Sequence, residues 1–186
     1  GDAIICTEVG QNQMWAAQFY KYKEPRQFIS SGGLGTMGYG LGAAIGGCIA
    51  ARGRRTVLFT GDGSFGMNLN ELATAVTYKI PVIIVLFNNG VLGMVRQWQS
   101  LFFNKHYSAT TLDRKTDFVK LAEAFGAKGV RTNTKEAFKA AFTEAYETAD
   151  GPVVIDCKIN EDELVLPMLP PGGSMDDLII EKEEDL

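Results

Sequence analysis

The residues from 57 to 98 constrain the fold most strongly. A short apolar run, residues 57–60, is rich in β-forming residues and ends at a glycine, as a buried strand should. A helix-like segment from Met67 to Lys79 follows, and Pro81 then introduces a second continuously apolar run, Val82 to Phe87. This order predicts two parallel strands joined by a helix, so the carboxyl ends of both strands open on one edge of a sheet.

Polar residues follow both of these strands. The segment GDGS, residues 61–64, comes after the first strand, and NNG, residues 88–90, comes after the second. A carboxylate and a carboxamide are hard oxygen ligands, and together with phosphate oxygens and a backbone carbonyl they suit an octahedral magnesium ion. The glycines allow close backbone approach, and the N–H groups after Asp62 can face an anion near a helix N-terminus. The sequence therefore predicts a magnesium–diphosphate anchor on Asp62 and Asn89.

The rest of the chain repeats the alternation of strand and helix. Further short strands are predicted at Ala3–Cys6, Gln27–Ser30, Ala127–Arg131 and Pro152–Cys157. Helices are predicted over Gln11–Tyr22, about Thr36–Ala51, Val91 to about Phe103, and two amphipathic segments capped by Thr116 and Thr134. This alternation predicts an α/β fold with three layers: a mostly parallel six-stranded sheet with helices on both faces.

The bulk composition excludes several classes of protein. The chain has 186 residues, enough for one domain with a full core, and its 46% hydrophobic and 22% charged content is typical of a globular protein. The net charge of −4 argues against a nucleic-acid surface. No apolar run approaches the roughly 20 residues that a membrane span needs. Cys6, Cys48 and Cys157 are widely spaced in apolar settings, which predicts buried, reduced thiols in a cytosol-like compartment.

Two glycine patterns suggest a different cofactor. Residues 33–38 and 61–66 both fit the dinucleotide-binding fingerprint, and Asp62 follows the first at a distance where a ribose-binding acid can lie. Two matches in one short chain show how weak the pattern is. The second match has asparagines, and no acid, at the end of its next strand. A dinucleotide-dependent oxidoreductase is therefore the disfavoured alternative.

The order Gly-Asp-Gly, a spacer and Asn-Asn, with 27 residues from Asp62 to Asn89, resembles the signature of thiamine-diphosphate enzymes. Other segments are similar to the catalytic (large) subunit of acetolactate synthase, also called acetohydroxyacid synthase. They are GQ at 10–11, QMWAAQFY at 13–20, SSGGLG at 30–35, ELAT at 71–74, GMVRQWQ at 93–99 and LPM at 166–168. The resemblance covers essentially the whole chain.

The resemblance implies a site for thiamine diphosphate and Mg²⁺. The implied cofactor-binding residues are Gln11, Asn12, Gly35, Met37, Asp62, Gly63, Ser64, Asn89, Val91, Gly93 and Met94. Metal ligands would be Asp62, Asn89 and the backbone carbonyl of Val91, and Met94 and Trp98 would line the substrate pocket. Met37 would support the bent cofactor. Asn12 stands where many members carry histidine, and its amide can still donate a hydrogen bond. Without the resemblance, Met37 is a core residue and Asn12 a helix cap.

The implied activity joins two 2-oxo acids, pyruvate with pyruvate or 2-oxobutyrate, in branched-chain amino-acid biosynthesis. The family's activating glutamate belongs to an N-terminal domain of a second catalytic subunit, in a homodimer or tetramer, and FAD belongs to a middle domain. No segment of this chain matches either domain, so no catalytic residue is assigned and the fragment alone is expected not to turn over pyruvate. A regulatory small subunit is a further implied partner.

Residues 1–165 are thus expected to form the diphosphate-anchoring domain, and residues 166–186 a C-terminal arm with an acidic tail. Prolines and glycines in the arm predict no regular structure there, and the arm is expected to be disordered or packed against a neighbour. The lone His106 and the acidic run 161–163 are interpreted as solvated. The chain starts without methionine, so a fragment of a longer protein is expected, cytoplasmic with a plastid location left open.

Two alternatives to this function remain. One is another thiamine-diphosphate enzyme of the pyruvate oxidase or decarboxylase type, against which the residues 94–98 and the Pro-Gly-Gly arm argue. The other is a non-catalytic binding or assembly module. Calorimetry with the cofactor separates the second alternative from the enzymes, and product analysis separates the enzymes from each other.

Overall fold

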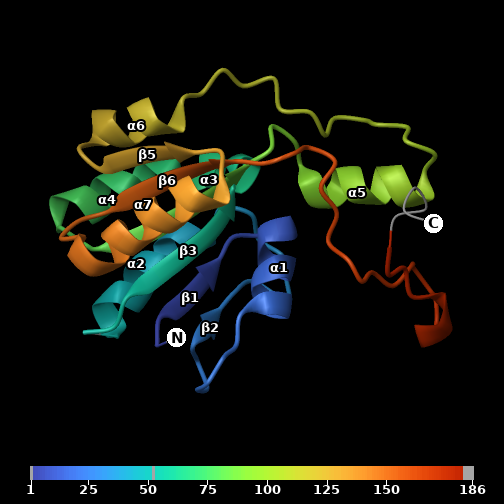
Figure 1. Ribbon diagram of the computed structural model, residues 1–186, viewed down its shortest axis with the longest axis horizontal. Coiled ribbons are helices and arrows are strands. Elements are labelled where there is room, and N and C mark those ends of the chain that lie inside the picture. Colours follow the sequence, from blue (N-terminus) through green and yellow to red (C-terminus); the bar gives the residue numbers. More distant parts are fainter. Residues whose placement is uncertain (1, 52, 182–186) are drawn as a thin grey trace.

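The computed structural model describes residues 2–51 and 53–181, and its centre is one six-stranded sheet (Figure 1). The spatial order of the strands is β2-β1-β3-β4-β6-β5, and every neighbouring pair is parallel. The strands are β1 (Ile4–Thr7), β2 (Phe28–Ile29), β3 (Thr56–Gly61), β4 (Val82–Asn88), β5 (Lys128–Thr132) and β6 (Val153–Lys158). The α/β prediction is confirmed, and the sheet is parallel throughout.

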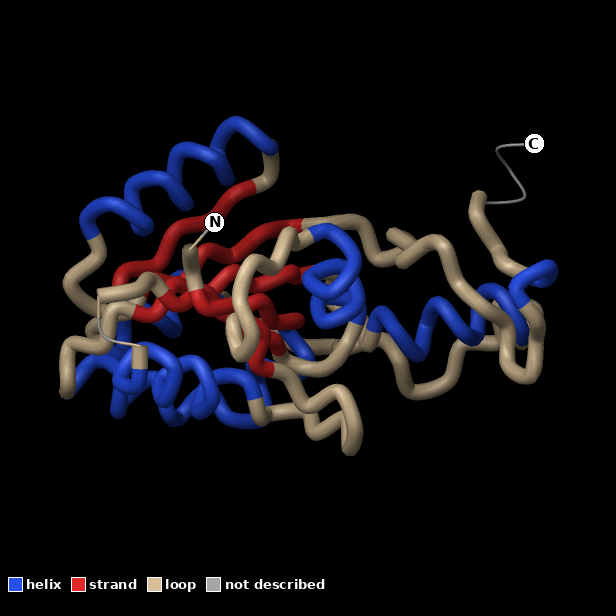
Figure 2. Tube along the Cα trace, turned by 90° about the horizontal axis from the view of Figure 1, so that it is seen from below, coloured by secondary structure: helices blue, strands red, loops and turns tan. Residues whose placement is uncertain are grey.

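Helices cover both faces of this sheet (Figure 2). The helices are α1 (Gln11–Phe19), α2 (Gly40–Ala50), α3 (Asp62–Asn68), α4 (Leu72–Thr77), α5 (Gly93–Phe102), α6 (Phe118–Phe125) and α7 (Lys135–Thr148), with 3-10 turns η1 (Leu69–Glu71) and η2 (Met175–Asp177). Residues of α2, α3, α4 and α6 pack on one face, and residues of α1 and α7 pack on the other. None of the helices within 2–51 and 53–181 is long and apolar enough to cross a membrane.

The central strand β4 shows why the sheet is buried on both sides. Val82, Ile84 and Leu86 join the core under α2, α4 and α6, whereas Ile83 and Val85 join the core under α1 and α7. Side chains of successive strand residues point to opposite faces, so a strand covered on both faces must be apolar at every position. This requirement explains the unbroken apolar run in the sequence, and all five of these residues have no exposed surface.

The helix predicted from Met67 to Lys79 is wrong in its bounds. Helix α3 begins directly after β3, at Asp62, and a 3-10 turn at Leu69–Glu71 separates it from α4, which ends at Thr77. The polar glycine segment therefore forms the first turn of a helix, and Asp62 lies there as an acidic residue favoured by the helix dipole. Lys79 has a positive φ of 49°, which is incompatible with a continuing helix.

Three other predicted helix ends also differ from the structure. Helix α1 stops at Phe19, so Tyr22 lies beyond it and instead donates a hydrogen bond to the Ala16 carbonyl at 2.9 Å. Helix α2 starts at Gly40, and residues 36–39 form turns. The predicted cap Thr116 is wrong: Asp117 caps α6 by accepting from the N–H groups of Val119 and Lys120, because it lies one residue closer to the first turn. The Thr134 cap of α7 is confirmed.

The Asp117 carboxylate also accepts from Arg131 at 2.6 Å, and the N–H of Lys120 and the Arg131 guanidinium hold its pKa below the usual 3.8. A carboxyl group with a lowered pKa stabilises the fold above its unfolded pKa, and the effect is lost as the pH falls through the folded pKa. We expect Asp117→Asn, which keeps the cap oxygen but not the charge, to be less stable than wild type at pH 7 and equal to it near pH 2. Urea unfolding across that range measures this. Asp113→Asn, on an exposed loop, is the charge-matched control, and a constant difference at all pH values would contradict the expectation.

The C-terminal arm is more ordered than its prolines and glycines predicted. Met168 and Ile179 pair as a short antiparallel bridge, and Ser174 forms a capping box with Asp177 at η2. The acidic run is not simply solvated, because Arg96 of α5 contacts Glu161 at 3.2 Å and Asp162 at 2.8 Å. The residues 182–186 of the predicted acidic tail lie outside the described residues.

The three cysteines carry free thiols. Cys6 and Cys157 are buried as predicted, and Cys48 is only half-buried. Burial raises the pKa of Cys6 to about 12, with a smaller contribution from Cys48. Because the thiolate is the reactive form, Cys6 is an inert core residue.

Candidate functional site

The first turn of α3, which directly follows β3, and the loop after β4 lie at the same edge of the sheet, where the sequence predicted two neighbouring segments. Gly61 pairs with Phe87 in register, so Asp62 and Asn89 both follow directly on neighbouring parallel strands. Asp62 is only 4% exposed, and burial raises the pKa of its carboxyl group, although the N–H groups of Asp62, Gly63 and Gly90 lower it. Its Oδ1 atom is buried with no hydrogen-bond partner among the described residues. A buried carboxylate oxygen without a partner is costly, which is expected where a cation binds.

A cavity of about 120 Å³ opens beside this carboxylate. Most of the predicted cofactor residues line it together: Gln11, Asn12, Met37, Gly63, Ser64, Asn89, Val91, Gly93 and Met94. Asp62 instead lines an adjoining hollow of about 290 Å³, which Asn89 also borders. Gly35 lies apart from both, in a turn closed by its N–H to the Ser31 carbonyl at 3.0 Å. The fold thus gathers predicted residues from four separate segments, 11–12, 37, 62–64 and 89–94, at this edge of the sheet.

The two residues at the start of α1 differ in their bonding. Gln11 is already engaged, since its amide donates to the Glu163 carbonyl at 2.7 Å and to Gln97 at 3.1 Å. Asn12 is 3% exposed, and its Oδ1 is buried without a partner in the described part of the chain. A half-turn about χ2 exchanges the ends of an amide, so this position can present either an acceptor or a donor. Asn12 is therefore the better placed of the two to bond a ligand.

Within residues 2–51 and 53–181, the Val91 carbonyl takes no part in the local backbone pairing. Val91 forms a bridge with Thr111, but the two hydrogen bonds of this bridge are Leu92 N–H to the Thr110 carbonyl and Leu112 N–H to the Gly90 carbonyl. Asn89 Oδ1 accepts from the Val91 N–H at 3.2 Å, which ties the amide side chain to the same turn. Residues 89–91 therefore place one side-chain oxygen and one backbone carbonyl within a single turn.

Glu8 is a further buried acidic residue at this edge of the sheet, and none of the sequence motifs predicts it. This residue has no exposed surface, and its carboxylate accepts hydrogen bonds from Gly38, Gly40 and Ser64. The Ser64 hydroxyl is thereby engaged within the protein, and it also lies within hydrogen-bond distance of the Val9 carbonyl, at 3.2 Å. Glu8 directly follows β1 as Asp62 directly follows β3, and this shared position at a strand end was the signal that could have identified it. Trp15, Leu92 and Ile159 also line the cavity without having been predicted.

A side chain at Gly93 fits only if the side chains of Gln11 and Asn89 shift. A Cβ atom there would collide with Gln11 Oε1 and lie 2.9 Å from Asn89 Nδ2. We expect Gly93→Ala to push both side chains into the cavity and weaken binding of a ligand there at least about tenfold, because overpacking costs about 1–3 kcal/mol. Titration calorimetry with the cofactor measures the loss.

Gly42→Ala is the matched control for this variant. Gly42 lies in α2, its Cβ position is open, and alanine there should stabilise the helix by about 1 kcal/mol without changing binding. Equal cofactor affinity in both variants would contradict the steric role of Gly93.

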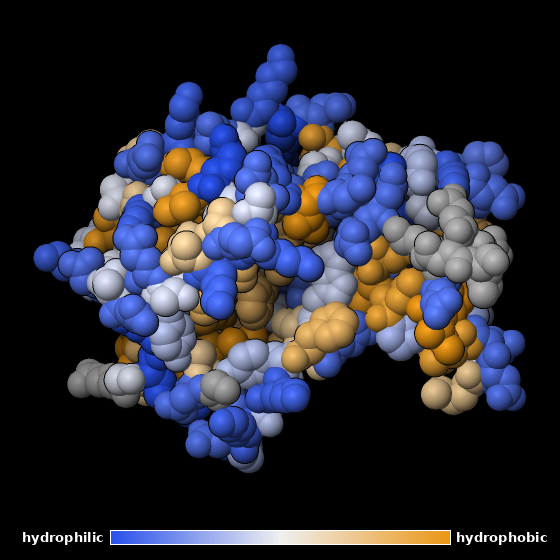
Figure 3. All heavy atoms as spheres, viewed as in Figure 1, coloured by the Kyte–Doolittle hydropathy of each residue, from blue (hydrophilic) through white to orange (hydrophobic). Residues whose placement is uncertain are grey.

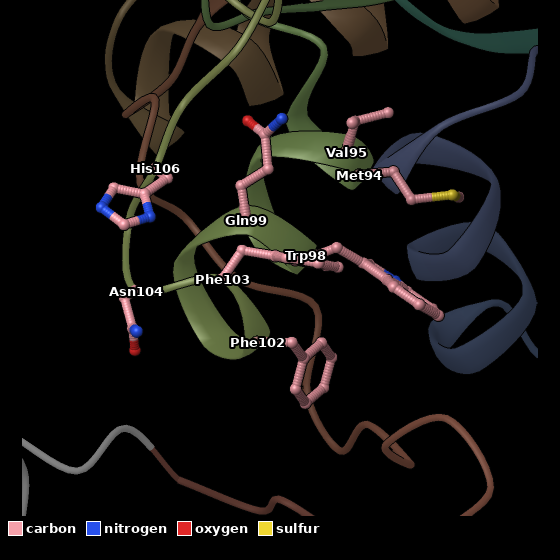
Figure 4. A pocket seen from close by; sticks show the side chains of 8 residues that line it. All are labelled: Met94, Val95, Trp98, Gln99, Phe102, Phe103, Asn104 and His106. Carbon is pink, nitrogen blue, oxygen red and sulfur yellow. The ribbon is translucent and has the colours of Figure 1, made fainter.

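The predicted substrate residues border a second, larger cavity of about 620 Å³ along α5 (Figure 4). Trp98 and Phe102 make an edge-to-face contact with ring centroids 5.5 Å apart, and Trp98 is 38% exposed. Met94 and Val95 line both cavities, so the two are adjacent. His106, predicted to be solvated, is exposed on the opposite rim from Met94 (Figure 4). Among the described residues no cluster of three His, Cys, Asp or Glu side chains is arranged for a metal ion.

The parallel sheet, with polar residues gathered at the carboxyl ends of its strands, has the architecture of an α/β cofactor-binding domain. A family model described as "Thiamine pyrophosphate enzyme, C-terminal TPP binding domain" matches residues 8–157, and the chain belongs to this family. Thiamine pyrophosphate is thiamine diphosphate under another name. This match argues against the dinucleotide alternative suggested by the glycine patterns, and it confirms thiamine diphosphate as the cofactor of the family.

The chain is similar to acetolactate synthase large subunits, as its motifs indicated. It is 46% identical over 178 residues to the isozyme 2 large subunit of Escherichia coli strain K12, covering 96% of this chain and 32% of that subunit. It is 47% identical over 178 residues to a probable acetolactate synthase large subunit of Methanocaldococcus jannaschii, covering 96% of this chain and 30% of that one. The chain therefore spans about a third of the length of these relatives.

A solved structure shares the fold. The thiamine diphosphate-dependent 4-hydroxybenzoylformate decarboxylase of Rhodococcus jostii RHA1 matches with a TM-score of 0.76 and 30% sequence identity. The match covers 86% of this chain and 30% of that chain.

Proposed function

We propose that this chain is the cofactor-anchoring domain of an acetolactate synthase large subunit. The observation that carries the proposal is the buried, unpartnered Asp62 oxygen at the sheet edge beside Asn89, in a chain whose family binds thiamine diphosphate. In the parent enzyme, pyruvate would be decarboxylated and joined to a second 2-oxo acid, pyruvate or 2-oxobutyrate. This chemistry is inferred from the similarity to acetolactate synthases at 46% and 47% identity.

The donor set at this edge fits Mg²⁺. Asp62 and Asn89 would supply side-chain oxygens and Val91 a backbone carbonyl, which are the hard ligands that magnesium takes together with phosphate oxygens. Asn12 and the backbone N–H groups of Gly63 and Ser64 would contact the diphosphate, and Met37 and Gly35 the aminopyrimidine end. Thiamine diphosphate, when bound, supplies the stabilisation of the carbanion, and the protein holds and orients it.

The substrate and the partners are proposed from the position of the second cavity. Met94 lines both the cofactor cavity and the hollow beside Trp98, so a substrate bound in that hollow would lie next to the cofactor. Hydrophobic side chains gather on the surface around α5 and the arm (Figure 3). The exposed members are Val95, Trp98, Phe103, Leu169, Met175 and Ile180. An apolar surface of this kind suits a contact with the N-terminal domain of a second catalytic subunit.

The rest of the proposal concerns the whole enzyme. Residues 1–165 form the anchoring domain and 166–186 the arm, and the activating glutamate and the FAD-binding middle domain belong to other parts of a parent subunit. Large subunits are named for their pairing with a small one, so a regulatory small subunit is a further proposed partner, in a cytoplasmic homodimer or tetramer. No catalytic residue is assigned to residues 1–186.

Titration calorimetry of the chain with thiamine diphosphate, with and without Mg²⁺, tests this function. We expect weak, magnesium-dependent binding and no acetolactate formation from pyruvate. Absence of binding would favour a non-catalytic assembly module, and acetolactate formation by this chain alone would refute the assignment of catalysis to other domains. The likeness to a decarboxylase supports a second candidate, another thiamine-diphosphate enzyme, which product analysis of the parent enzyme distinguishes.

A further inference from the structure

Glu8 is a buried carboxylate that the proposed chemistry does not use. It directly follows β1 and has no exposed surface. Its Oε1 accepts the Gly40 N–H at 2.8 Å, and its Oε2 accepts the Gly38 N–H at 2.9 Å and the Ser64 hydroxyl at 3.1 Å. Removing a carboxylate from water is costly unless donors replace the water, so three donors around a fully buried one mark an organised contact.

The contact between Glu8 and the start of α2 depends on features of both partners. Helix α2 begins at Gly40 and has no side-chain cap of its own, so the Glu8 carboxylate takes that place at the positive end of the helix dipole. A Cβ atom on Gly40 would lie 2.8 Å from Glu8 Cγ and 2.9 Å from its Cδ. Only glycine permits this approach, which explains the residue at the start of α2.

The three donors belong to two different walls of the cofactor cavity. Gly38 and Gly40 hold the turn that carries Met37, and Ser64 lies in the first turn of α3 next to Gly63. Met37 and Gly63 face each other there, because the Met37 methyl carbon lies 3.8 Å from where a Cβ on Gly63 would be. A single carboxylate therefore fixes the position of one wall relative to the other.

We propose that Glu8 is a positioning residue for thiamine diphosphate, which holds the Met37 turn against the first turn of α3 so that both ends of one cofactor molecule are bound at once. The inference rests on the proposed function, because it takes the Met37 side as the wall for the aminopyrimidine ring and the α3 side as the wall for the diphosphate. Glu8 itself contacts backbone groups and Ser64, and not the cavity.

The geometry predicts that Glu8→Gln weakens the binding of thiamine diphosphate more than the binding of inorganic pyrophosphate. In Glu8→Gln the amide nitrogen cannot accept, so at least one of the three donors loses its partner and the two walls can separate. Thiamine diphosphate needs both walls, whereas inorganic pyrophosphate needs only the α3 wall. We expect the Kd of thiamine diphosphate to rise at least about tenfold and that of pyrophosphate to rise less than about threefold, each measured with Mg²⁺.

The test is titration calorimetry of the full chain with both ligands, on wild type, Glu8→Gln and Glu8→Asp. The shorter aspartate keeps the charge and should recover part of the lost affinity for thiamine diphosphate. Ile5→Val is the control, because Ile5 lies on the same strand, is buried, and packs in the core under α1 and α7, away from the Met37 turn. Ile5→Val destabilises β1 but keeps Glu8, so it should leave the affinities for thiamine diphosphate and pyrophosphate unchanged.

The outcomes separate the inference from the function on which it rests. A wild type that binds neither ligand overturns the proposed function and the inference with it. A wild type that binds both, with Glu8→Gln changing neither affinity or changing both equally, overturns the inference alone, as does a wild type that binds pyrophosphate but not thiamine diphosphate. If Glu8→Gln does not fold, Ser64→Ala serves instead, because it removes one of the three hydrogen bonds to Glu8. We expect it to raise the Kd of thiamine diphosphate about threefold and the Kd of pyrophosphate by less. An equal change of both Kd values overturns the inference.

Discussion

Replacing Asp62 by asparagine is expected to abolish magnesium-dependent binding of thiamine diphosphate while making the ligand-free protein more stable. The carboxylate is 4% exposed, with one oxygen that has no partner among the described residues, so nearby N–H groups and Arg114 offset only part of the cost of burying its charge until a cation binds. The isosteric amide removes this charge at the same volume. We expect the free energy of unfolding at pH 7 to rise by about 1 kcal/mol and the cofactor affinity to fall at least about 100-fold.

Chemical unfolding and calorimetry on the same samples measure the two effects. Asp113→Asn makes the same change of charge on an exposed loop, and should alter neither quantity by much. A variant that is less stable than wild type, or that still binds the cofactor only when magnesium is present, would argue that Asp62 is a structural residue rather than a metal ligand. A variant that gains stability and loses cofactor affinity is what the replacement of a binding residue should give.

Gln97→Ala is expected to release the start of the C-terminal arm from α5. Gln97 is 3% exposed, accepts from the Val165 N–H at 2.8 Å, and donates to the Val165 carbonyl at 2.9 Å. It also lies 3.0 Å from the Met168 sulfur. Loss of this side chain leaves two buried backbone groups unpaired, which costs about 3 kcal/mol. We expect amide exchange at Val165 to accelerate roughly 100-fold.

Hydrogen exchange followed by residue-resolved NMR measures this release. Gln99→Ala is the matched control on the same helix, since Gln99 contacts Ser108 and Thr110 and not the arm. Gln11 also bonds Gln97 and the Glu163 carbonyl, so Gln97→Ala should weaken cofactor binding as well. Unchanged protection of Val165 would show that Arg96 and the Met168–Ile179 bridge hold the arm without Gln97.

The sequence predicts those features that depend on burial and on strand ends. The unbroken apolar run of β4 identifies a strand covered on both faces, and the strand-end positions of Asp62 and Asn89 predict that their loops meet. Both follow from geometry that every parallel α/β sheet shares. The six strands and both layers of helices were predictable for the same reason.

Other features depend on contacts between segments far apart in the chain. The sequence does not predict the helix that starts at Asp62, because its glycines are weak helix formers and the close approach of Leu92 and Leu112 to Gly63 exists only in the folded chain. Glu8 could not be connected to Gly40 or Ser64, since 32 and 56 residues separate the partners. The arm was predicted to be irregular from its composition, whereas Gln97 holds it in place. Each of these contacts exists only once the sheet has formed.

Both borders of the sheet are poor templates for adding a further strand. On one side, β2 is only two residues long, and on the other, β5 carries the half-exposed charges of Lys128 and Arg131. Short or cationic border strands disfavour the lateral pairing that leads to fibrils. With such borders, the domain can expose the apolar surface around α5 that is proposed to contact a partner, without also exposing a sheet edge that favours aggregation.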